Sequence, residues 1–527
     1  MHRKAGLSFR IPDTPSMRTL LSTSAALLLT ITQAQPGTLD ASFGTGGEVL
    51  IPLGTAFDLM WDMAIQTDDK IVVVGGMGFG AAEDAMILRF NADGSVDNTF
   101  GTNGQVIWAG TMGADRARAV DIDANGRIVV AGDTRITTTE TQMFILRLQE
   151  DGSFDNTFSS DGLLVRTGTV YDDGTYARDV VCQPNGNILV GGYLHYSLVA
   201  PFHNETSLWV CTSTGGTASV FGGGSVAGWD LYQDDLSDVA NSMVVRNDGS
   251  IALGTASEYG ADQRMGIVLF DSDGSLPLGF QEGVYDFTTA DDYANSILLM
   301  PDGRFILAGG ASYQAGMAAI IPTIGGLDPG FGTAGKVDIQ LGSVQTSLYS
   351  ALVQPWDKIL VSGSFSNGTG STGGLYLGRY NSDGTADTPF GTNGFATHMP
   401  GGYFGEGRAI GLQSDGRIVV GGNMNVDSDR DMFLARFEND LATEATTAAR
   451  APQLSACPNP FSGTLTVQGT SANGQLTLID ALGRTVLSAR STDGRTELHP
   501  ADLPPGIYTF RYQHGDGHVD ALRVVAE

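Results

Sequence analysis

The chain has 527 residues, of which 72 are glycine and only 17% are charged, and its net charge is −29. Glycine is therefore at about twice its usual ~7% share, and charged residues are below the usual ~25%. This composition excludes a helical bundle or coiled coil, and the acidic balance argues against a nucleic-acid partner, because phosphate binding requires a basic surface. Since 42% of the residues are apolar, we expect a packed all-β protein with many tight turns.

The N-terminal segment has the features of a secretory signal peptide in the correct order. Residues 17–35 read MRTLLSTSAALLLTITQAQ: one arginine, an apolar stretch, and small residues before a cut after Ala34. The apolar run is too short and too interrupted for a membrane span of ~20 residues, although a buried or anchoring helix is an alternative. We assign residues 1–36 to a signal region, with Met17 as the candidate start, and expect no transmembrane segment in the mature chain.

Residues 37–440 contain a pattern that repeats seven times. One anchor is a turn followed by an apolar strand that ends at glycine, as in ANGRIVVAGD and SDGRIVVGGN. Its turn residue recurs every 54 to 63 residues, at Asp69, Gly126, Gly186, Gly249, Gly303, Asp357 and Gly416. The second anchor is a phenylalanine, usually followed by glycine, at Phe43, Phe100, Phe158, Phe221, Phe280, Phe331 and Phe390. Regular alternation of the two anchors defines seven units.

Each unit has the content of four short strands separated by Asn-Gly, Asp-Gly and Gly-Gly turns. In the second unit we predict them at residues 104–109, 118–122, 127–131 and 143–148. A single four-stranded sheet cannot bury both faces, but seven sheets arranged radially bury one another. We therefore predict an all-β fold, a seven-bladed β-propeller; a β-solenoid, the rival, has shorter repeats with fewer strands.

The phase of the repeat predicts a closed ring. The pattern begins in mid-unit, at LDASFG from Leu39, and ends in mid-unit, at MFLARFEND from Met432. In interior units the two pieces are contiguous, as in ILRFNADGSVDNTFG from Ile87. Pairing of the two ends in one blade would supply the last strand and close the ring.

The motif LRFNADGSVDNTFGTNG followed by DGRIVVAG resembles the delta-60 repeat family of secreted bacterial proteins, over about residues 38–439. Asp69 and Asp357 depart from the usual glycine, and the units that contain Phe221 and Phe280 are degenerate. The resemblance implies extracytoplasmic β repeats and supplies no catalytic residue.

The C-terminal part is predicted to be a separate module. Residues 441–455 are small and polar, as in a linker. Six short strands with tight turns follow, which predicts a small antiparallel β-sandwich at residues 456–527. Its motifs PNPF, LIDALGRTVLSAR and LPPGIYTFRY resemble the type A C-terminal sorting domain of the type IX secretion system of Bacteroidota, with Cys457 in place of the more usual aromatic residue. The resemblance implies that residues 456–527 engage the secretion machinery; an independent adhesive sandwich is the alternative.

Three N-x-D-G-x-x-D-like segments are the candidate calcium loops: Asn91, Asp93 and Asp97; Gln149, Asp151 and Asp155; Asn381, Asp383 and Asp387. The leading position of each holds an arginine, Arg89, Arg147 or Arg379, which opposes a divalent ion. We therefore favour turns in which the aspartate caps backbone N–H groups and the arginine pairs with a carboxylate, and expect no cofactor. Cys182 and Cys211 could form a disulfide, but buried thiols are the favoured interpretation.

The candidate binding residues occupy one repeat position, eight residues before each turn residue. They are Trp61, Arg118, Arg178, Asn241, Asn295, Tyr349 and Arg408. The symmetry of the repeat places them on one ring, near a face, and their side chains suit a carbohydrate or peptide site. The alternative is a structural ring in which the arginines pair with aspartates.

No catalytic motif has the required context, although a carboxylate pair for glycoside hydrolysis could lie among the many acids. The sequence thus predicts a secreted or surface-attached, monomeric propeller that binds an extracellular glycan or protein without catalysis. The alternative is a secreted propeller hydrolase or lyase that acts on glycans.

Overall fold

In the computed structural model, the structure describes residues 35–53, 57–78, 83–110, 112–166, 174–196, 203–216, 226–229, 237–259, 262–277, 282–287, 291–311, 314–341, 345–366, 373–427 and 429–440, and most of the strand residues between 455 and 526. The predicted signal region up to Ala34, the linker up to residue 454, and Phe221 and Phe280 lie outside the described residues.

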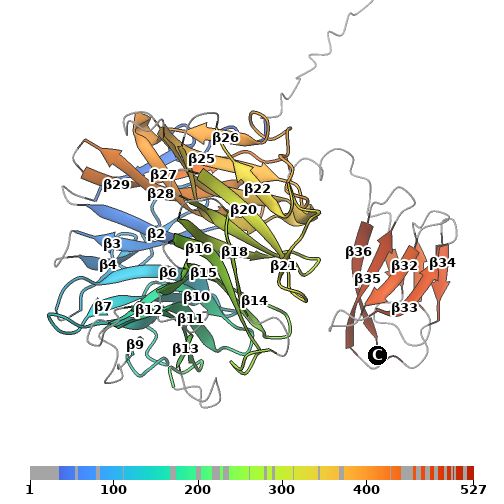
Figure 1. The fold of residues 1–527 in the computed structure, drawn as a ribbon, viewed down its shortest axis with the longest axis horizontal. Helices are drawn as coiled ribbons and strands as arrows, with labels where there is room; N and C mark the ends of the chain where they lie inside the picture. The colour runs from blue at the N-terminus through green and yellow to red at the C-terminus, as the bar shows by residue number, and fades with distance from the viewer. Residues whose placement is uncertain are drawn as a thin grey trace, which may run out of the picture. The chain divides into compact units, whose positions relative to one another are not determined.

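The described strands between residues 48 and 437 form seven blades (Figure 1). Blades 1 and 2 consist of β2 (Asp58–Ile65), β3 (Ile71–Met77), β4 (Asp84–Phe90) and β5 (Gln105–Trp108), then β6 (Arg116–Ile122), β7 (Ile128–Arg135), β8 (Thr141–Leu148) and β9 (Leu163–Val165). Blades 3 and 4 consist of β10 (Gly174–Cys182), β11 (Ile188–Tyr196), β12 (His203–Cys211) and β13 (Val226–Trp229), then β14 (Asp238–Val245), β15 (Ile251–Tyr259), β16 (Asp262–Phe270) and β17 (Glu282–Tyr285).

Blade 5 consists of β18 (Asp292–Leu299), β19 (Phe305–Ala311), β20 (Gln314–Ile321), the two-residue β21 (Gly326–Leu327) and β22 (Lys336–Ile339). Blade 6 consists of β23 (Gln345–Val353), β24 (Ile359–Ser366), β25 (Gly373–Tyr380) and β26 (Phe395–His398). Blade 7 consists of β27 (Phe404–Leu412), β28 (Ile418–Val426), β29 (Asp429–Phe437) and the N-terminal β1 (Glu48–Ile51). Two 3-10 turns, η3 (Pro355–Asp357) and η4 (Pro400–Gly402), complete the described elements between residues 48 and 437.

The first strand of each blade is the innermost one. The innermost strands contact one another in chain order, β2, β6, β10, β14, β18, β23 and β27, and β27 contacts β2 again. In Figure 1 the blue strands of blade 1 accordingly lie beside the orange strands of blade 7. This closed cycle of contacts is the ring predicted for a propeller.

The closing blade combines the two ends of the repeat region, as the sequence predicts. Strand β1 pairs antiparallel with β29, with Ile51 opposite Met432. Next to this pair, Nε of Arg436 donates a 2.7 Å hydrogen bond to Oδ2 of Asp40. The prediction of ring closure is therefore confirmed. We call the pairing of β1 with β29, together with the Asp40–Arg436 contact, the seam.

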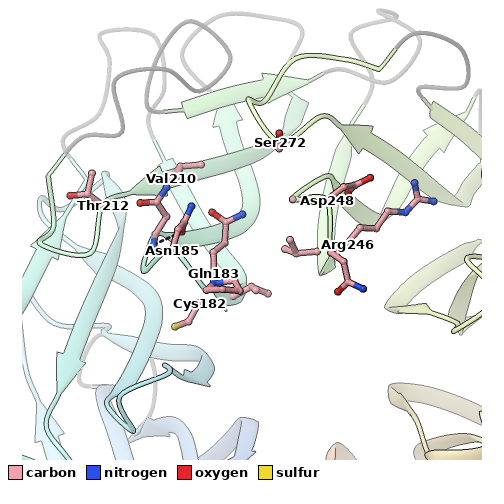
Figure 2. A pocket seen from close by; sticks show the side chains of 14 residues that line it. Cys182, Gln183, Asn185, Val210, Thr212, Arg246, Asp248 and Ser272 are labelled. Atoms are coloured by element: carbon pink, nitrogen blue, oxygen red, sulfur yellow. Dashed lines mark hydrogen bonds between the residues drawn. The ribbon is translucent and has the colours of Figure 1, made fainter. Parts of the chain in front are cut away.

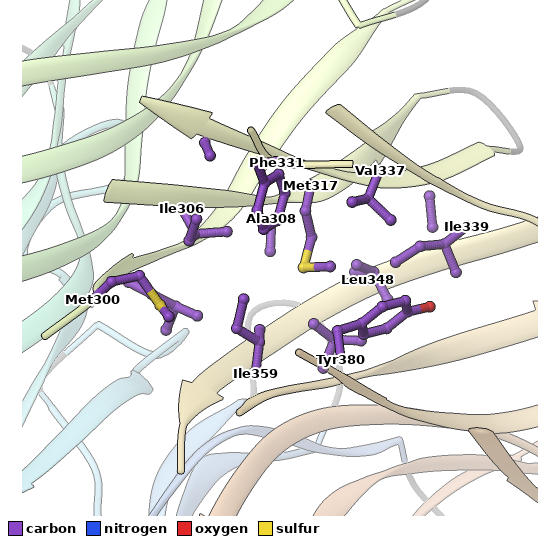
Figure 3. Packing of buried hydrophobic residues seen from close by; sticks show 14 of the residues in the cluster. Met300, Ile306, Ala308, Met317, Phe331, Val337, Ile339, Leu348, Ile359 and Tyr380 are labelled. Carbon is purple, nitrogen blue, oxygen red and sulfur yellow. The ribbon is translucent and has the colours of Figure 1, made fainter. Parts of the chain in front are cut away.

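The hydrophobic cores lie between neighbouring blades. Figure 3 shows the cluster between blades 5 and 6, in which Met317 and Phe331 pack near Leu348 and Ile359. Similar clusters join the other blades, with interior strands such as β3 (IVVVGGM) almost entirely buried. Burial of each large apolar side chain contributes about 1.5–3 kcal/mol. The fold is therefore stabilised mainly by contacts between blades.

The strand predictions for the second unit are close, but the phase of the blade is different. The predicted strand at residues 104–109 is β5, and β5 pairs with β4 as the outermost strand of blade 1. Blade 2 instead ends with β9. The cause is the return of the chain across the Asn-Ala-Asp-Gly turn after β4, which places residues 105–108 along the same sheet.

The C-terminal module is a two-sheet β structure, as predicted. One sheet contains β30 (Ser455–Cys457), β31 (Leu465–Gln468) and β34 (Arg495–Leu498). The other contains β33 (Thr485–Arg490), β32 (Gln475–Ile479), β35 (Gly506–Gln513) and β36 (Val519–Ala526). Side chains from both sheets, including Leu465, Leu478 and Phe510, form one buried cluster.

Candidate functional site

All seven predicted binding residues lie on innermost strands, one in each blade. Each stands at a shift in the register with the second strand of its blade, so that it is the extra residue of a β-bulge. A bulge bends the strand and re-aims the side chain. We call these residues the inner ring: Trp61, Arg118, Arg178, Asn241, Asn295, Tyr349 and Arg408.

The inner ring lies further inside the propeller than predicted. Each innermost strand begins two to four residues before its ring residue, so the ring lies near the middle of these strands and not at their heads. All seven side chains are half-buried. The prediction did not include the residues that start each strand, which are polar or glycine in six blades and Phe404 in blade 7.

Cations and aromatic rings alternate across blades 6, 7, 1 and 2. The guanidinium of Arg408 lies 4.0 Å from the ring centre of Tyr349 and 5.8 Å from that of Trp61. The guanidinium of Arg118 lies 4.4 Å from the ring centre of Trp61. Such cation–π contacts hold the four side chains against one another.

Most of the polar ring residues have partners within the protein. Arg118 donates a 2.9 Å hydrogen bond from Nε to Asp133, and Arg408 donates a 2.7 Å bond from its guanidinium to Glu406. Asn241 donates to the carbonyl of Ala294, and Asn295 to the carbonyl of Leu348, each on the next blade. These two asparagines and the two paired arginines therefore contribute to the structure.

Two ring residues carry donors without a partner. Within the described part of the chain, Nε of Arg178 and Nε1 of Trp61 are shielded from solvent and have no hydrogen-bond acceptor. The guanidinium of Arg178 lies 5.2 Å from the ring centre of Tyr193, which itself stacks on Tyr176. Burial, and then the charge of Arg118, lower the pKa of Arg178 from its ordinary value.

Three carboxylates on the innermost strands were not among the predicted site residues. Asp62, Asp121 and Asp179 each accept a backbone N–H from the next blade, donated by Val120, Cys182 and Met243 respectively. Burial raises the pKa of Asp62 to about 6, and burial and the charge of Asp62 raise that of Asp179 to about 7. Each carboxylate therefore links its own innermost strand to the innermost strand of the next blade. Asp62 and Asp179 directly follow their ring residues, whereas Asp121 lies three residues after Arg118, so the three do not form one repeated position.

The candidate calcium segments form a different structure, which we call the outer staple. In blades 1, 2, 6 and 7 an arginine donates from Nε to an aspartate at 2.6–2.8 Å and lies over a phenylalanine ring at 4.6–4.8 Å. The four sets are Arg89–Asp97–Phe100, Arg147–Asp155–Phe158, Arg379–Asp387–Phe390 and Arg436–Asp40–Phe43.

The aspartate of the outer staple also caps a turn. Oδ1 of Asp97 accepts hydrogen bonds from the backbone N–H and hydroxyl of Thr99. Burial opposes ionisation, but these hydrogen bonds and the Arg89 and Lys70 charges lower the pKa of Asp97 to about 2. Arg89 also donates to the carbonyl of Glu150 on blade 2. The favoured prediction of Asx turns with paired arginines is confirmed for this segment.

A recess lies between blades 3 and 4, at the turns that follow the innermost strands. It has a volume of about 790 Å³, and Gln183, Asn185, Arg246 and Asp248 line it (Figure 2). Val210 also lines it, at the position where blades 1 and 2 carry the staple arginine.

Both described thiols are free. Cys182 and Cys211 pair with opposite sides of Ile188, on strands that flank β11, so their side chains are two strands apart. Burial raises the pKa of Cys182, and raises that of Cys211 to about 12. The favoured prediction was two buried thiols: Cys211 is buried, whereas Cys182 is half-buried.

Sequence profiles of two families match the chain. The family described as a domain of unknown function (DUF5122) beta-propeller matches residues 66–100, 124–158, 354–390 and 413–446. These are segments of blades 1, 2, 6 and 7, the blades that carry the outer staple. The secretion system C-terminal sorting domain matches residues 455–525.

Among solved structures, PorZ, a type-IX secretion surface component of Porphyromonas gingivalis, is 12% identical, with 90% of this chain and 60% of that chain covered and a TM-score of 0.38. The extracellular domain of a hybrid two-component system of B. thetaiotaomicron is 11% identical, with 94% and 59% covered and a TM-score of 0.39. Sqt1 of Chaetomium thermophilum is 12% identical, with 74% and 97% covered and a TM-score of 0.40.

The chain spans about 60% of the length of the first two of these structures. No curated protein sequence matches it significantly. None of the helices within the described residues has the length and apolar character needed to cross a bilayer. The repeats, the closed ring of blades and the sorting module together identify a secreted or cell-surface protein with DUF5122 β-propeller repeats and a type IX secretion system C-terminal sorting domain.

Proposed function

We propose that this exported propeller is a non-catalytic binding protein whose ligand, an extracellular glycan or protein, contacts the inner ring. The observation that carries the proposal is the bulge at the same position of all seven innermost strands. Bulges often re-aim side chains next to functional sites. The side chains at these bulges differ between blades, which suits recognition of an asymmetric ligand.

The carboxylates near the inner ring support binding more than hydrolysis. Asp62, Asp121 and Asp179 have raised pKa values, a property shared by catalytic acids. Both oxygens of each, however, accept backbone N–H groups, for example those of Met63 and Val120 at Asp62. A carboxylate held in this way is poorly placed to transfer a proton to a substrate.

The test is a glycan and protein array with the full-length protein, combined with a hydrolysis screen of every bound glycan. Binding without turnover, lost when Arg118, Arg178 and Arg408 are changed together to Ser, supports the proposal. Turnover of a bound glycan, or binding that the substitutions leave unchanged, overturns it. Because the triple variant loses two ion pairs, Arg178→Ser alone provides a variant that is expected to fold.

We further propose that the sorting module at residues 456–527 binds the secretion machinery directly. Deletion of Ala456–Glu527 should leave the protein in the periplasm of its host. Fusion of the same residues to a secreted reporter should send the reporter to the medium or the cell surface. Normal appearance of the truncated protein in the medium would contradict the proposal.

A further inference from the structure

The inner ring contains one arginine that forms no ion pair within the described residues, although the charge of Asp133 acts on it at longer range. Arg118 has Asp133 at 2.9 Å and Arg408 has Glu406 at 2.7 Å, whereas Arg178 has no ion pair within the described residues. A guanidinium has only donors and stays charged in proteins. Because Nε of Arg178 is shielded from solvent and has no acceptor, an acceptor placed there would stabilise the guanidinium.

The missing counter-charge has a specific origin in the repeat. In blade 2 Asp133 lies opposite Arg116 on the neighbouring strand, and at the equivalent place in blade 3 Tyr193 lies opposite Tyr176. Blade 3 therefore has a phenol ring where blade 2 has a carboxylate. The guanidinium of Arg178 lies 5.2 Å from the ring centre of Tyr193, and its Nε has no acceptor within the described residues.

The other features of the inner ring favour a ligand that supplies a hydrogen-bond acceptor over a ligand that stacks the face of a sugar on an aromatic ring. The rings of Trp61, Tyr349 and Tyr193 each already have an arginine over them. What the ring lacks is an acceptor, because Nε of Arg178 and Nε1 of Trp61 have none. Arginine binds planar oxyanions with two parallel hydrogen bonds.

We infer that Arg178 binds an oxyanion group of the ligand, a carboxylate or sulfate, which takes the place of the carboxylate absent from blade 3. This inference rests on the proposed function and specifies the chemistry of its ligand. Arg118, whose charge acts on Arg178, adds to the positive potential there.

The test is calorimetric titration of the full-length protein at 150 mM NaCl with D-glucuronate, inorganic sulfate and neutral D-glucose. We expect at least one anion to bind and glucose not to bind. Arg178→Gln should weaken that binding by about 10- to 100-fold, as for loss of a hydrogen bond to a charged group. Response to glucuronate alone identifies a carboxylate, and response to sulfate alone identifies a sulfate.

Two further variants separate the site from general charge effects. Tyr193→Asp should abolish anion binding with Arg178 still present, because the new carboxylate occupies the guanidinium as Asp133 does in blade 2. Arg127→Gln, on the turn after β6, where its guanidinium bonds Asp123, should leave binding unchanged. Equal weakening by Arg127→Gln and Arg178→Gln would overturn the assignment.

The outcomes also separate this inference from the proposed function. Binding of neutral glycans or proteins at the inner ring, without response to either anion, overturns the inference and leaves the proposed function intact. Absence of any bound glycan or protein in the array overturns the proposed function, and the inference with it.

Discussion

The outer staple and the inner ring each occupy a fixed position of the same repeat. The staple keeps the same residue types in the blades that contain it, whereas the ring residues differ between blades. The staple uses the same arginine, aspartate and phenylalanine in four blades, with nearly the same distances. The ring uses tryptophan, tyrosine, asparagine and arginine. The difference indicates that the repeated arginine–aspartate–phenylalanine set joins neighbouring blades. The different side chains at the bulges of the innermost strands give this propeller a surface of its own.

The two regions also differ in how well their charges are compensated. The guanidinium and carboxylate of the Arg147–Asp155 staple are both fully buried and paired at 2.7 Å. The ring contains paired and unpaired arginines side by side. Removal of an arginine charge should therefore lower stability at the outer staple. At the inner ring the effect on stability should depend on whether the arginine is paired.

Loss of the seam between the two ends should have the largest effect. Deletion of Thr38–Ile51 removes Asp40 and Phe43 of one outer staple and the strand that pairs with β29. The edge of β29 and an apolar face of blade 7 would be exposed, so the protein should aggregate or lose its cooperative melt. Calorimetry checks this. A deletion of similar length within the linker, residues 441–454, should melt normally, and an unchanged melt of the first variant would contradict ring closure.

Removal of one staple arginine should have the next largest effect. Arg147→Gln removes the closest partner of the buried Asp155, whose remaining ion pair is with Arg127 at 3.4 Å. Removal of one partner of a buried pair costs about 3–5 kcal/mol, so with Arg127 still present we expect a loss of about 3 kcal/mol. The free energy of unfolding from denaturant titration should fall by that amount. Arg135→Gln, an arginine without an ion pair in the described structure, should change it by less than ~0.5 kcal/mol. Equal effects would show that the staple is not a major source of stability.

Two substitutions in the inner ring should have different effects on stability. Arg118→Gln deprives the buried carboxylate of Asp133 of its closest partner, and should cost about 1–3 kcal/mol. Arg178→Gln removes a charge that has no partner, so stability should stay the same or rise. The measurement is again denaturant titration of the two variants. A large loss of stability with Arg178→Gln would retire the ligand site at Arg178.

The closed propeller could be predicted from the sequence because each blade repeats the same turn and strand signals. Trp61 and Arg118 could be assigned to the same position of the propeller by counting back from the turn residue. This works because every innermost strand ends the same number of residues before its turn residue. Their bulges could not be predicted, because a register shift depends on the partner strand. Counting also missed Asp62 and Asp121, which act between blades from different offsets.

The phase of the blades was predicted incorrectly for a similar reason. A strand such as residues 105–108 has the same local pattern whichever sheet it joins. Its partner is decided by the outer staple, where Arg89 accepts the backbone N–H of Asp97 at its carbonyl and donates its own N–H to Gly104. The sequence predicted the staple as turns in which an arginine pairs with a carboxylate. Its role in joining blades depends on contacts between residues about 60 positions apart in the sequence, such as Arg89 and Glu150, which a local pattern does not reveal.

The smallest predicted effect is the dependence of stability on pH, which should have opposite signs in the two regions. The pKa of Asp97 in the outer staple is lowered to about 2, so its stabilisation is present above its unfolded pKa of ~3.9 and is lost as the pH falls towards 2. The pKa values of Asp62 and Asp179 are raised to about 6 and about 7. Their protonated forms favour the folded state, so this stabilisation is present below pH ~3.9 and is lost as the pH rises through 6 and 7.

The melting temperature should therefore be highest near pH 4–5 and fall by a few degrees towards pH 8. Asp179→Ser tests the inner contribution, because Ser242 occupies the equivalent place in blade 4 and accepts the N–H of Ile297 through its hydroxyl. The variant should keep the cap, remove the repulsion from Asp62 and flatten the decline between pH 5 and 8. Scanning calorimetry across this range is the measurement. An unchanged slope would mean that Asp179 is already ionised at pH 5, and that the charges near the inner ring are compensated in the folded state.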